Sequence, residues 1–316
     1  MQYSKLITMK YKSINHFLSA LLFILSSFIG YAQPDSFKGN KAINGTNLFV
    51  NIRGQGEYLL VLHGGPGLNH AYFLPYLNAL EKNFKVVYYD QRACGKSSIP
   101  SPDSISMKFF VEDMEAIRKN LKVDKLNVLA HSWGAVLAAH YTLAYPNRIQ
   151  KLILSNPSMF SREYDEEASK LIKKNSTRED SLAQAQLMAG GNLNSEKYEK
   201  LFLLSFKPSA FNKANVSKIN LDLPANFGEA NNILFGALMK DPSLNANLYD
   251  SLKAFQFPVL IIHGKADVIP MSAIERLKTT LPQANLEIFQ QSGHFPFVEE
   301  TDRFNTVVLK FLLHKK

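Results

Sequence analysis

The chain contains the segment KLNVLAHSWG at residues 125–134, in which an apolar run leads directly into a serine flanked by small residues. Residues 135–145 then have a helical composition, so the segment predicts a strand, a sharp turn and a helix, with Ser132 at the tip of the turn. Such a turn holds the serine hydroxyl clear of its neighbours, and the small residues Ala130 and Gly134 let strand and helix pass closely. The segment therefore predicts a nucleophilic serine.

Apolar runs of strand length alternate with segments of helical spacing along most of the chain. The predicted strands are 37–43 and 48–52, paired around Asn44-Gly45, and then 58–62, 84–89, 151–155, 258–263 and 286–289. The predicted helices are 72–81, 106–121, 272–281 and 301–313. This alternation indicates an α/β fold whose mostly parallel sheet is covered by helices on both faces.

A serine hydroxyl becomes a nucleophile when an imidazole accepts its proton and a carboxylate orients that imidazole. Asp267 follows strand 258–263, and His294 follows strand 286–289 with Gly293 before it. Reactive groups gather at the carboxyl ends of parallel strands, and the chain order serine, acid, histidine fits this topology. We therefore predict a catalytic triad of Ser132, Asp267 and His294. The rival acid position, after strand 151–155, holds Asn156, which cannot carry the negative charge.

Four other histidines are weaker candidates for the base. His131 adjoins the serine, with its side chain expected to point elsewhere, and His263 ends its strand too early. His63 is expected to make a structural hydrogen bond, and His140 is expected to pack in mid-helix. The single cysteine, Cys94, lacks a placed base, and we predict that it packs near the floor of the site.

Acyl transfer also requires donors for the oxyanion. The backbone N–H of Trp133 follows the nucleophile at a helix N-terminus, which places it well for this role. The second donor is predicted in the glycine-rich loop His63-Gly64-Gly65-Pro66-Gly67, where Gly65 permits close backbone approach. We also predict that Gly64 contacts the substrate.

Residues 157–253 interrupt the alternation, since they lack clear strands and are rich in helix-forming and charged residues. Helices are predicted at 163–174, 178–188, 195–204 and 230–238. We interpret the segment as a helical cap inserted after the sixth core strand, between core segments 33–156 and 254–316. The alternative interpretation is a separate domain.

The first 32 residues resemble an export signal. Three lysines and no acidic residue precede or flank an apolar segment at 17–30, and Gly30 and Ala32 suit cleavage before Gln33. The alternative is an uncleaved anchor, but the apolar run is shorter than the roughly 20 residues that span a bilayer. We predict an exported protein, periplasmic or secreted, without a stable membrane span after cleavage.

Composition narrows the function further. The formal net charge of +9 falls to +6 without the three signal lysines, and the basic residues are scattered, which argues against nucleic acid as a partner. The histidines are dispersed and no cysteine pair occurs, so we predict neither a metal site nor a cofactor. The oligomeric state is left open.

The loop at 63–67, the segment DQRACGKS at 90–97 and the serine motif at 131–134 together resemble the α/β-hydrolase fold. Within it they are similar to the proline iminopeptidase group of serine peptidases. The resemblance covers nearly the whole mature chain except the cap. It implies a Ser-His-Asp enzyme that removes an N-terminal residue, typically proline, from small peptides without a metal or cofactor.

The chain departs from that group in places. Ala93, Ala130 and Ala135 stand where the group usually has glycine. The group's cap carries a tryptophan-glutamate pair whose glutamate holds the substrate amine, whereas Trp133 is the only tryptophan here. Glu229 is our candidate for this amine anchor. The alternatives are Glu163, Glu166 and Glu167, and the competing interpretation of each is a solvated helix charge.

The leading hypothesis is thus an exported serine hydrolase with iminopeptidase-like specificity. A second hypothesis is an esterase, lactonase or other small-acyl hydrolase of the same fold, which needs no amine-binding carboxylate. A third is a non-catalytic binding or signalling protein. Epoxide hydrolysis and dehalogenation in this fold would require an aspartate nucleophile, so Ser132 argues against both reactions.

Overall fold

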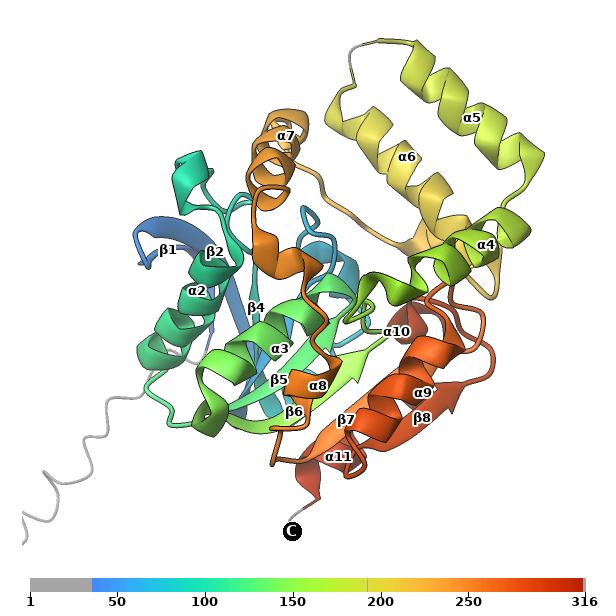
Figure 1. Ribbon diagram of the computed structural model, residues 1–316. Helices are drawn as coiled ribbons and strands as arrows, with labels where there is room; N and C mark the ends of the chain where they lie inside the picture. Colours follow the sequence, from blue (N-terminus) through green and yellow to red (C-terminus); the bar gives the residue numbers. More distant parts are fainter. Residues whose placement is uncertain (1–35, 192, 315–316) are drawn as a thin grey trace, which may run out of the picture. The chain divides into compact units, whose positions relative to one another are not determined.

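A single eight-stranded sheet organises the described part of the chain, with strand order β1-β2-β4-β3-β5-β6-β7-β8 (Figure 1). The strands are β1 (Phe37–Ile43), β2 (Thr46–Gly54), β3 (Glu57–Leu62), β4 (Phe84–Tyr89), β5 (Leu126–His131), β6 (Ile149–Ser155), β7 (Val259–Gly264) and β8 (Asn285–Phe289). β2 pairs antiparallel with β1 and β4, and all other pairings are parallel. The predicted mostly parallel sheet is confirmed.

This computed structural model describes residues 36–191 and 193–314. The predicted export signal at 1–32 lies outside the described residues. Within them, no helix is both long enough and apolar enough to cross a membrane.

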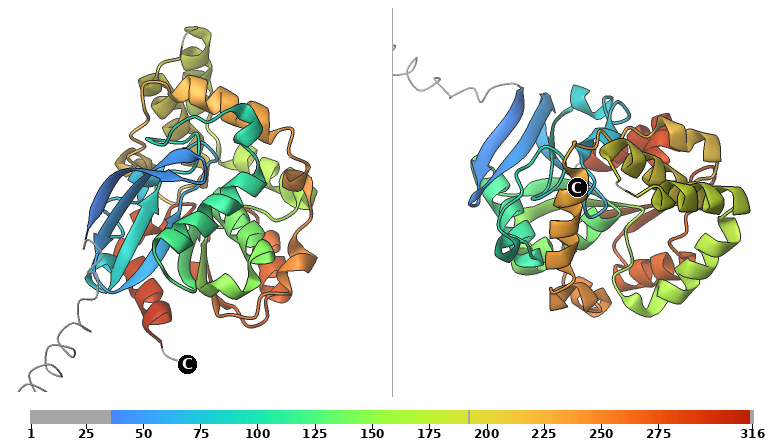
Figure 2. Two further views of the ribbon diagram at one scale, coloured as in Figure 1. Left: turned by 90° about the vertical axis from the view of Figure 1, so that its left-hand side faces the viewer. Right: turned by 90° about the horizontal axis from the view of Figure 1, so that it is seen from above.

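Helices cover both faces of the sheet, because the apolar side chains of the central strands point alternately to one face and to the other (Figure 2). In β3, Leu60 and Leu62 face one core, and Leu59 and Val61 face the other. The first core is closed by α2 (Met107–Asn120), α3 (Trp133–Ala144), α8 (Tyr249–Leu252) and α9 (Met271–Thr280). The second is closed by α10 (Pro296–Glu299) and α11 (Thr301–Leu313).

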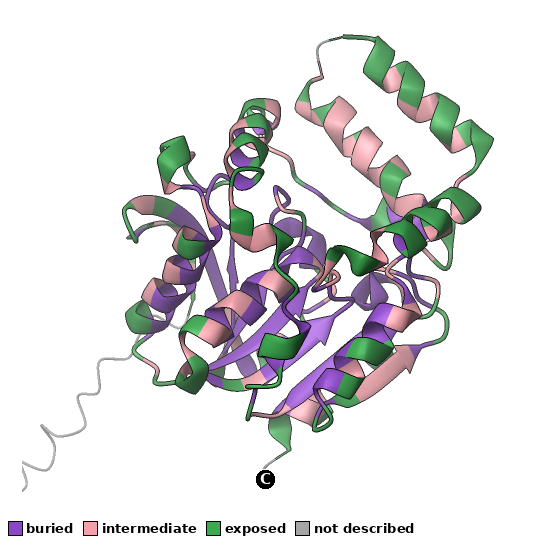
Figure 3. Cartoon of the chain, viewed as in Figure 1, coloured by how far each residue is buried: buried purple, intermediate pink, exposed green. Residues whose placement is uncertain are grey.

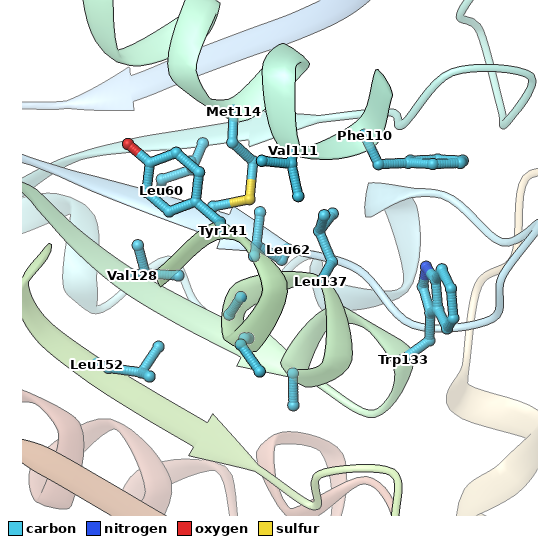
Figure 4. Packing of buried hydrophobic residues seen from close by; sticks show 14 of the residues in the cluster. Leu60, Leu62, Phe110, Val111, Met114, Val128, Trp133, Leu137, Tyr141 and Leu152 are labelled. Carbon is cyan, nitrogen blue, oxygen red and sulfur yellow. The ribbon is translucent and has the colours of Figure 1, made fainter. Parts of the chain in front are cut away.

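The first core joins α2 and α3 to the central strands. Met114 of α2 and Leu137 of α3 meet over Leu60, Leu62 and other strand side chains (Figure 4). All of these side chains are essentially buried. This packing anchors α3, and with it the turn that carries Ser132, to the middle of the sheet.

The prediction of a helix at 72–81 is wrong. The structure has two short 3-10 helices instead, His70–Phe73 and Leu80–Lys82, with turns between them. Pro75 explains the difference, because proline lacks an N–H and its ring clashes with the preceding turn of an α-helix. The tyrosine within the first 3-10 helix, Tyr72, is buried beneath the glycine-rich loop.

The insertion between β6 and β7 is helical, as predicted. It contains α4 (Asp165–Asn175), α5 (Arg178–Ala189), α6 (Ser195–Phe206) and α7 (Phe227–Leu238). α5 and α6 form a projecting hairpin in which α5 is mostly exposed and α6 is mostly half-buried (Figure 3). The residues described from Ser36 onward cluster as one compact unit.

Gly134 marks the closest passage of α3 over β3. A Cβ at this position would lie 2.5 Å from the carbonyl oxygen of Leu62 and 3.0 Å from that of His63. Both neighbours are backbone atoms at the end of a central strand, which cannot move aside cheaply. Glycine at the second position after the serine is therefore required by packing.

We expect Gly134→Ala to lower the unfolding free energy by about 1–3 kcal/mol, because the added methyl group forces α3 away from β3. Chemical denaturation measures the change. Gly236→Ala is the matched control, since it lies in exposed helix α7, where an added methyl group would meet nothing within 4 Å, and should stabilise slightly. Equal effects at the two sites would contradict the packing argument.

Candidate active site

Ser132 occupies a strained turn between β5 and α3. Its backbone has φ 54° and ψ −123°, in a region that non-glycine residues rarely adopt. Three hydrogen bonds hold it: its N–H donates to Ser155 O at 3.1 Å, and its carbonyl accepts from Ala135 N at 2.9 Å and Ser158 N at 3.2 Å. The structure thus has the sharp strand-to-helix turn that the sequence predicts, with the serine at its tip.

Asp267 and His294 lie in the loops that follow the neighbouring parallel strands β7 and β8. The His294 Nδ1 and Asp267 Oδ2 atoms are 2.8 Å apart. The Asp267 side chain is fully buried, whereas that of His294 is 14% exposed. Burial alone would raise the pKa of Asp267, but the charge and hydrogen bond of His294 outweigh it and hold the pKa below its usual value. The aspartate therefore stays ionised beside the imidazole.

Asn156, in the rival acid position after β6, supports the aspartate instead. Its Nδ2 donates to Asp267 Oδ2 at 2.7 Å and to the carbonyl oxygen of Gly293 at 3.0 Å. Its φ of 44° turns the chain sharply at the strand end. The Asn156 side chain thus joins Asp267 to the loop that carries His294. This role was not predicted from the sequence, where the position was considered only as a possible site for the acid.

Among the described residues, Ser132 makes no hydrogen bond to His294, but the residue before it lies against the histidine. Ser132 Oγ lies 3.4 Å from Ser158 Oγ, and over residues 36–191 and 193–314 no hydrogen bond joins it to His294. The ring of His131, the residue before the serine, lies 4.9 Å from the ring of His294. Hydrogen bonds between nucleophile and base are often long in ligand-free structures. The geometry therefore brings Asp267 and His294 of the predicted triad into contact, and it places the residue before Ser132 against the histidine.

The glycine-rich loop lies against the serine. A Cβ on Gly64 would be 3.0 Å from the Cβ of Ser132, which shows how closely the loop approaches. The Gly64 N–H donates to the hydroxyl of Tyr72 at 2.5 Å, so it is already used. Among the described residues, the N–H of Gly65 has no hydrogen-bond partner, and that of Trp133 opens helix α3. These two amides are the donors left for an oxyanion.

Two buried side chains orient this loop. His63 Nε2 accepts from the Gln91 N–H at 2.9 Å, so the proton sits on Nδ1, which donates to Gly64 O at 2.8 Å. Burial lowers the pKa of His63 to about 4 and keeps the ring neutral near pH 7. The Gln91 side chain donates to His63 O at 2.8 Å and accepts from Trp133 Nε1 at 3.1 Å. Gln91 therefore joins both donor-bearing segments, which sequence reasoning missed.

His131 points away from the nucleophile, in keeping with the prediction. Its Nδ1 lies 2.9 Å from the Tyr72 hydroxyl, and its Nε2 lies 2.8 Å from the carbonyl oxygen of His294. Since that carbonyl can only accept, Nε2 carries the proton and Nδ1 accepts from Tyr72. Burial, and then the charge of His294, lower its pKa well below the usual value. His131 thus links the glycine-rich loop to the histidine loop as a neutral group.

The remaining predicted residues differ in burial. Cys94 is buried, and burial raises the pKa of its thiol, which disfavours the nucleophilic thiolate. Glu229 lies in the first turn of α7 and is exposed. The alternative anchors Glu163, Glu166 and Glu167 also reach solvent. Their assignment to a substrate amine stays a prediction.

A cavity of about 190 Å³ lies next to the turn that carries Ser132, although Ser132 itself does not line it. Ser158, the neighbour of the Ser132 hydroxyl, lies on its wall beside Trp133. Much of the remaining wall is apolar, including Val136, Met159, Phe160, Leu244 and Leu248. The wall also includes His140 and the charged residues Arg162 and Asp165.

The fold and this arrangement of side chains define a hydrolase class. A family model for the α/β hydrolase fold matches residues 57–301, and the chain belongs to this family. The proline iminopeptidase of Lactobacillus delbrueckii subsp. bulgaricus is 30% identical over 270 residues, covering 81% of this chain and 89% of the relative.

Solved structures agree on the fold. The proline iminopeptidase of Mycobacterium smegmatis superposes with a TM-score of 0.65 at 21% identity, covering 87% of this chain and 97% of the other. Est816, described as an N-acyl homoserine lactone degrading enzyme, gives 0.62 at 22% identity over 86% and 99%. At these identities the structural likeness establishes the architecture and leaves the substrate to be argued from the site.

We expect the buried neutral His63 to make stability fall with acidification. The unfolded chain binds a proton near pH 6.5, whereas native His63 binds one only near pH 4, so its contribution is complete above pH 6.5 and is lost as pH falls toward 4. The loss is about 3 kcal/mol. Urea denaturation at pH 7 and pH 4.5 measures it.

The comparison variant is His63→Gln, which can still accept from Gln91 and donate to Gly64. Its stability should vary less over the same pH range, because the titrating group is gone. An identical pH dependence in the two proteins would show that His63 is not the source.

Proposed function

We propose that the protein is a serine hydrolase in which Ser132 is the nucleophile, His294 the general base and Asp267 the group that orients the imidazole. The observation that carries the proposal is the 2.8 Å contact between His294 and a fully buried Asp267, beside a serine with strained backbone. Asn156 adds a second donor to the same carboxylate oxygen. A serine hydroxyl becomes nucleophilic when a histidine accepts its proton and a carboxylate orients that histidine, and these residue types are present here.

In the proposed reaction the Ser132 side chain turns about χ1 from Ser158 toward His294. Ser132 Oγ then attacks the substrate carbonyl carbon while His294 Nε2 accepts the hydroxyl proton. The N–H groups of Gly65 and Trp133 stabilise the oxyanion; losing one such donor typically costs about 3 kcal/mol in the barrier. His294 gives the proton to the leaving group, and water hydrolyses the acyl-enzyme by the reverse proton path.

For the substrate we propose release of proline or another N-terminal residue from small peptides. The support comes from relatives at about 30% identity over most of their length that are named proline iminopeptidase. The largely apolar cavity of about 190 Å³ beside Ser158 is consistent with a compact ring such as that of proline. Glu229 remains our candidate for the amine anchor.

The alternative is hydrolysis of esters, lactones or other small acyl compounds. Two observations favour it: the tryptophan-glutamate pair of the iminopeptidase cap is missing, and all four candidate glutamates reach solvent. An ester substrate brings no free amine and needs no anchoring carboxylate. We also propose that the enzyme acts after export, on the strength of the lysines, the apolar segment and the small residues within positions 1–32.

We expect proline 2-naphthylamide to be hydrolysed by the wild type and Ser132→Ala to lower kcat at least about 10⁴-fold, because the nucleophile is lost. Initial rates measure this. A fluorophosphonate probe should label the wild type at Ser132 and leave the variant unlabelled.

The outcomes separate the three hypotheses. Labelling with cleavage of aminoacyl naphthylamides supports the peptidase. Labelling with cleavage of acyl esters or lactones alone supports the alternative. A folded wild-type protein that neither reacts with the probe nor turns over any substrate would sink the hydrolase proposal in favour of a binding protein.

We expect Val136→Phe to raise KM for a proline substrate about tenfold while leaving the smaller glycyl substrate nearly unchanged, because the added ring fills the cavity beside Ser158. Steady-state kinetics on both substrates measures the ratio. Val136→Ala is the control, since it enlarges the same cavity. Parallel losses on both substrates in Val136→Phe would mean that the cavity does not hold the substrate side chain.

A further inference from the structure

A segment of the cap crosses directly over the loop that carries His294. We call residues 206–212, which follow from the end of α6, the cap strap. The backbone N–H of His294 donates to the strap's Ser209 carbonyl at 2.7 Å. A Cβ on Gly293 would overlap that same carbonyl, so glycine is needed for the strap to approach this closely. The backbone of the proposed base is thus bonded to the cap.

Glu299 in α10 binds both partners at once. Its Oε1 accepts from the Asn212 N–H at 2.8 Å, and its Oε2 accepts from the Gly293 N–H at 2.6 Å. A longer bond from the Phe211 N–H, at 3.4 Å, reaches the same Oε2. One carboxylate therefore joins two amides of the strap to the amide that precedes His294, and charged acceptors make the stronger hydrogen bonds.

Further contacts tie the strap to the surrounding elements. Phe206 packs on Phe295, the residue after His294, with ring centroids 4.9 Å apart. Asn175, at the end of α4, donates to the carbonyl oxygen of Pro208 at 2.9 Å. A shift of the cap helices would therefore reach the histidine loop through the strap.

We propose that Glu299 is a positioning residue that couples docking of the cap strap to the orientation of His294. The proposal rests on the proposed function, in which His294 is the base. With the strap docked, the loop is held on both sides, by Glu299 through the Gly293 N–H and by Asn156 through Gly293 O. With the strap released, two of the three donors on Glu299 and the Ser209 acceptor are lost together, and the backbone of His294 loses its hydrogen bond to the cap.

This arrangement makes the cap more than a cover for the substrate. Displacing a catalytic group by about 1 Å can cost about 10²-fold in rate. The enzyme would be competent only while the strap is seated, so that any ligand or contact that lifts the cap also switches off the base.

The test is Glu299→Gln, which keeps the shape of the side chain but has one acceptor oxygen where the carboxylate has two, and sets an NH₂ group against an amide donor. We expect the rate of fluorophosphonate labelling and kcat to fall about 10- to 100-fold with KM within about twofold. The low-field proton resonance shared by His294 Nδ1 and Asp267 should broaden or vanish, a signature that a general loss of stability below the melting transition does not produce.

Asp241→Asn is the matched control. Asp241 also accepts two backbone amides, from Met107 at 2.6 Å and Ser243 at 2.9 Å, and so joins the end of the insertion to the core away from the histidine loop. It should label at the wild-type rate. Wild-type labelling and an unchanged proton resonance in folded Glu299→Gln, or an equal loss in Asp241→Asn, would overturn the proposal.

Gly293→Ala attacks the same contact from the other side and serves if Glu299→Gln folds poorly. Its methyl group pushes the strap off the loop while Glu299 stays intact, so the same loss of labelling and of the resonance is expected. Full labelling in this variant overturns the proposal. A wild-type protein that does not react with the probe at all contradicts the proposed function instead, which keeps the two failures distinct.

Discussion

The strained turn at Ser132 is the constraint on which the rest of the site depends. A backbone with φ 54° persists only where its surroundings hold it firmly, and here three hydrogen bonds and the packing of α3 on β3 do so. Strand β5 before it is central in the sheet, and helix α3 after it packs in the first core. The sheet and α3 thereby fix the backbone position of Ser132.

The other groups of the site lie at the same edge of the sheet as Ser132 because the strands are parallel. β3, β5, β6, β7 and β8 all point the same way, so the loops that follow them meet at one edge. Each loop contributes one kind of group: amides, the serine, an amide side chain, the acid and the imidazole. Hydrogen bonds between loops, such as that of Asn156 to Gly293, then fix their relative positions.

Local sequence signals were enough to predict the sheet and the placement of the serine, acid and histidine, since these depend on apolar periodicity, chain order and position after a strand. The failure at 72–81 came from reading helical spacing through Pro75, which breaks an α-helix. Gln91, Asn156 and Glu299 were missed for a different reason. Each bonds to backbone atoms far away in the chain, and no local pattern announces such a partner.

The position of Gln91 has a consequence for how such a site diverges. Its side-chain amide donates to the carbonyl oxygen of His63 and accepts from the indole N–H of Trp133. Gln91 thus holds together the loop at 63–67, the segment at 90–97 and the serine motif at 131–134. A substitution in one of these segments requires compatible residues in the other two. A chimera that borrows only one of them from a distant homologue would mismatch its neighbours, so these motifs should be inherited together while the cap around them is free to vary.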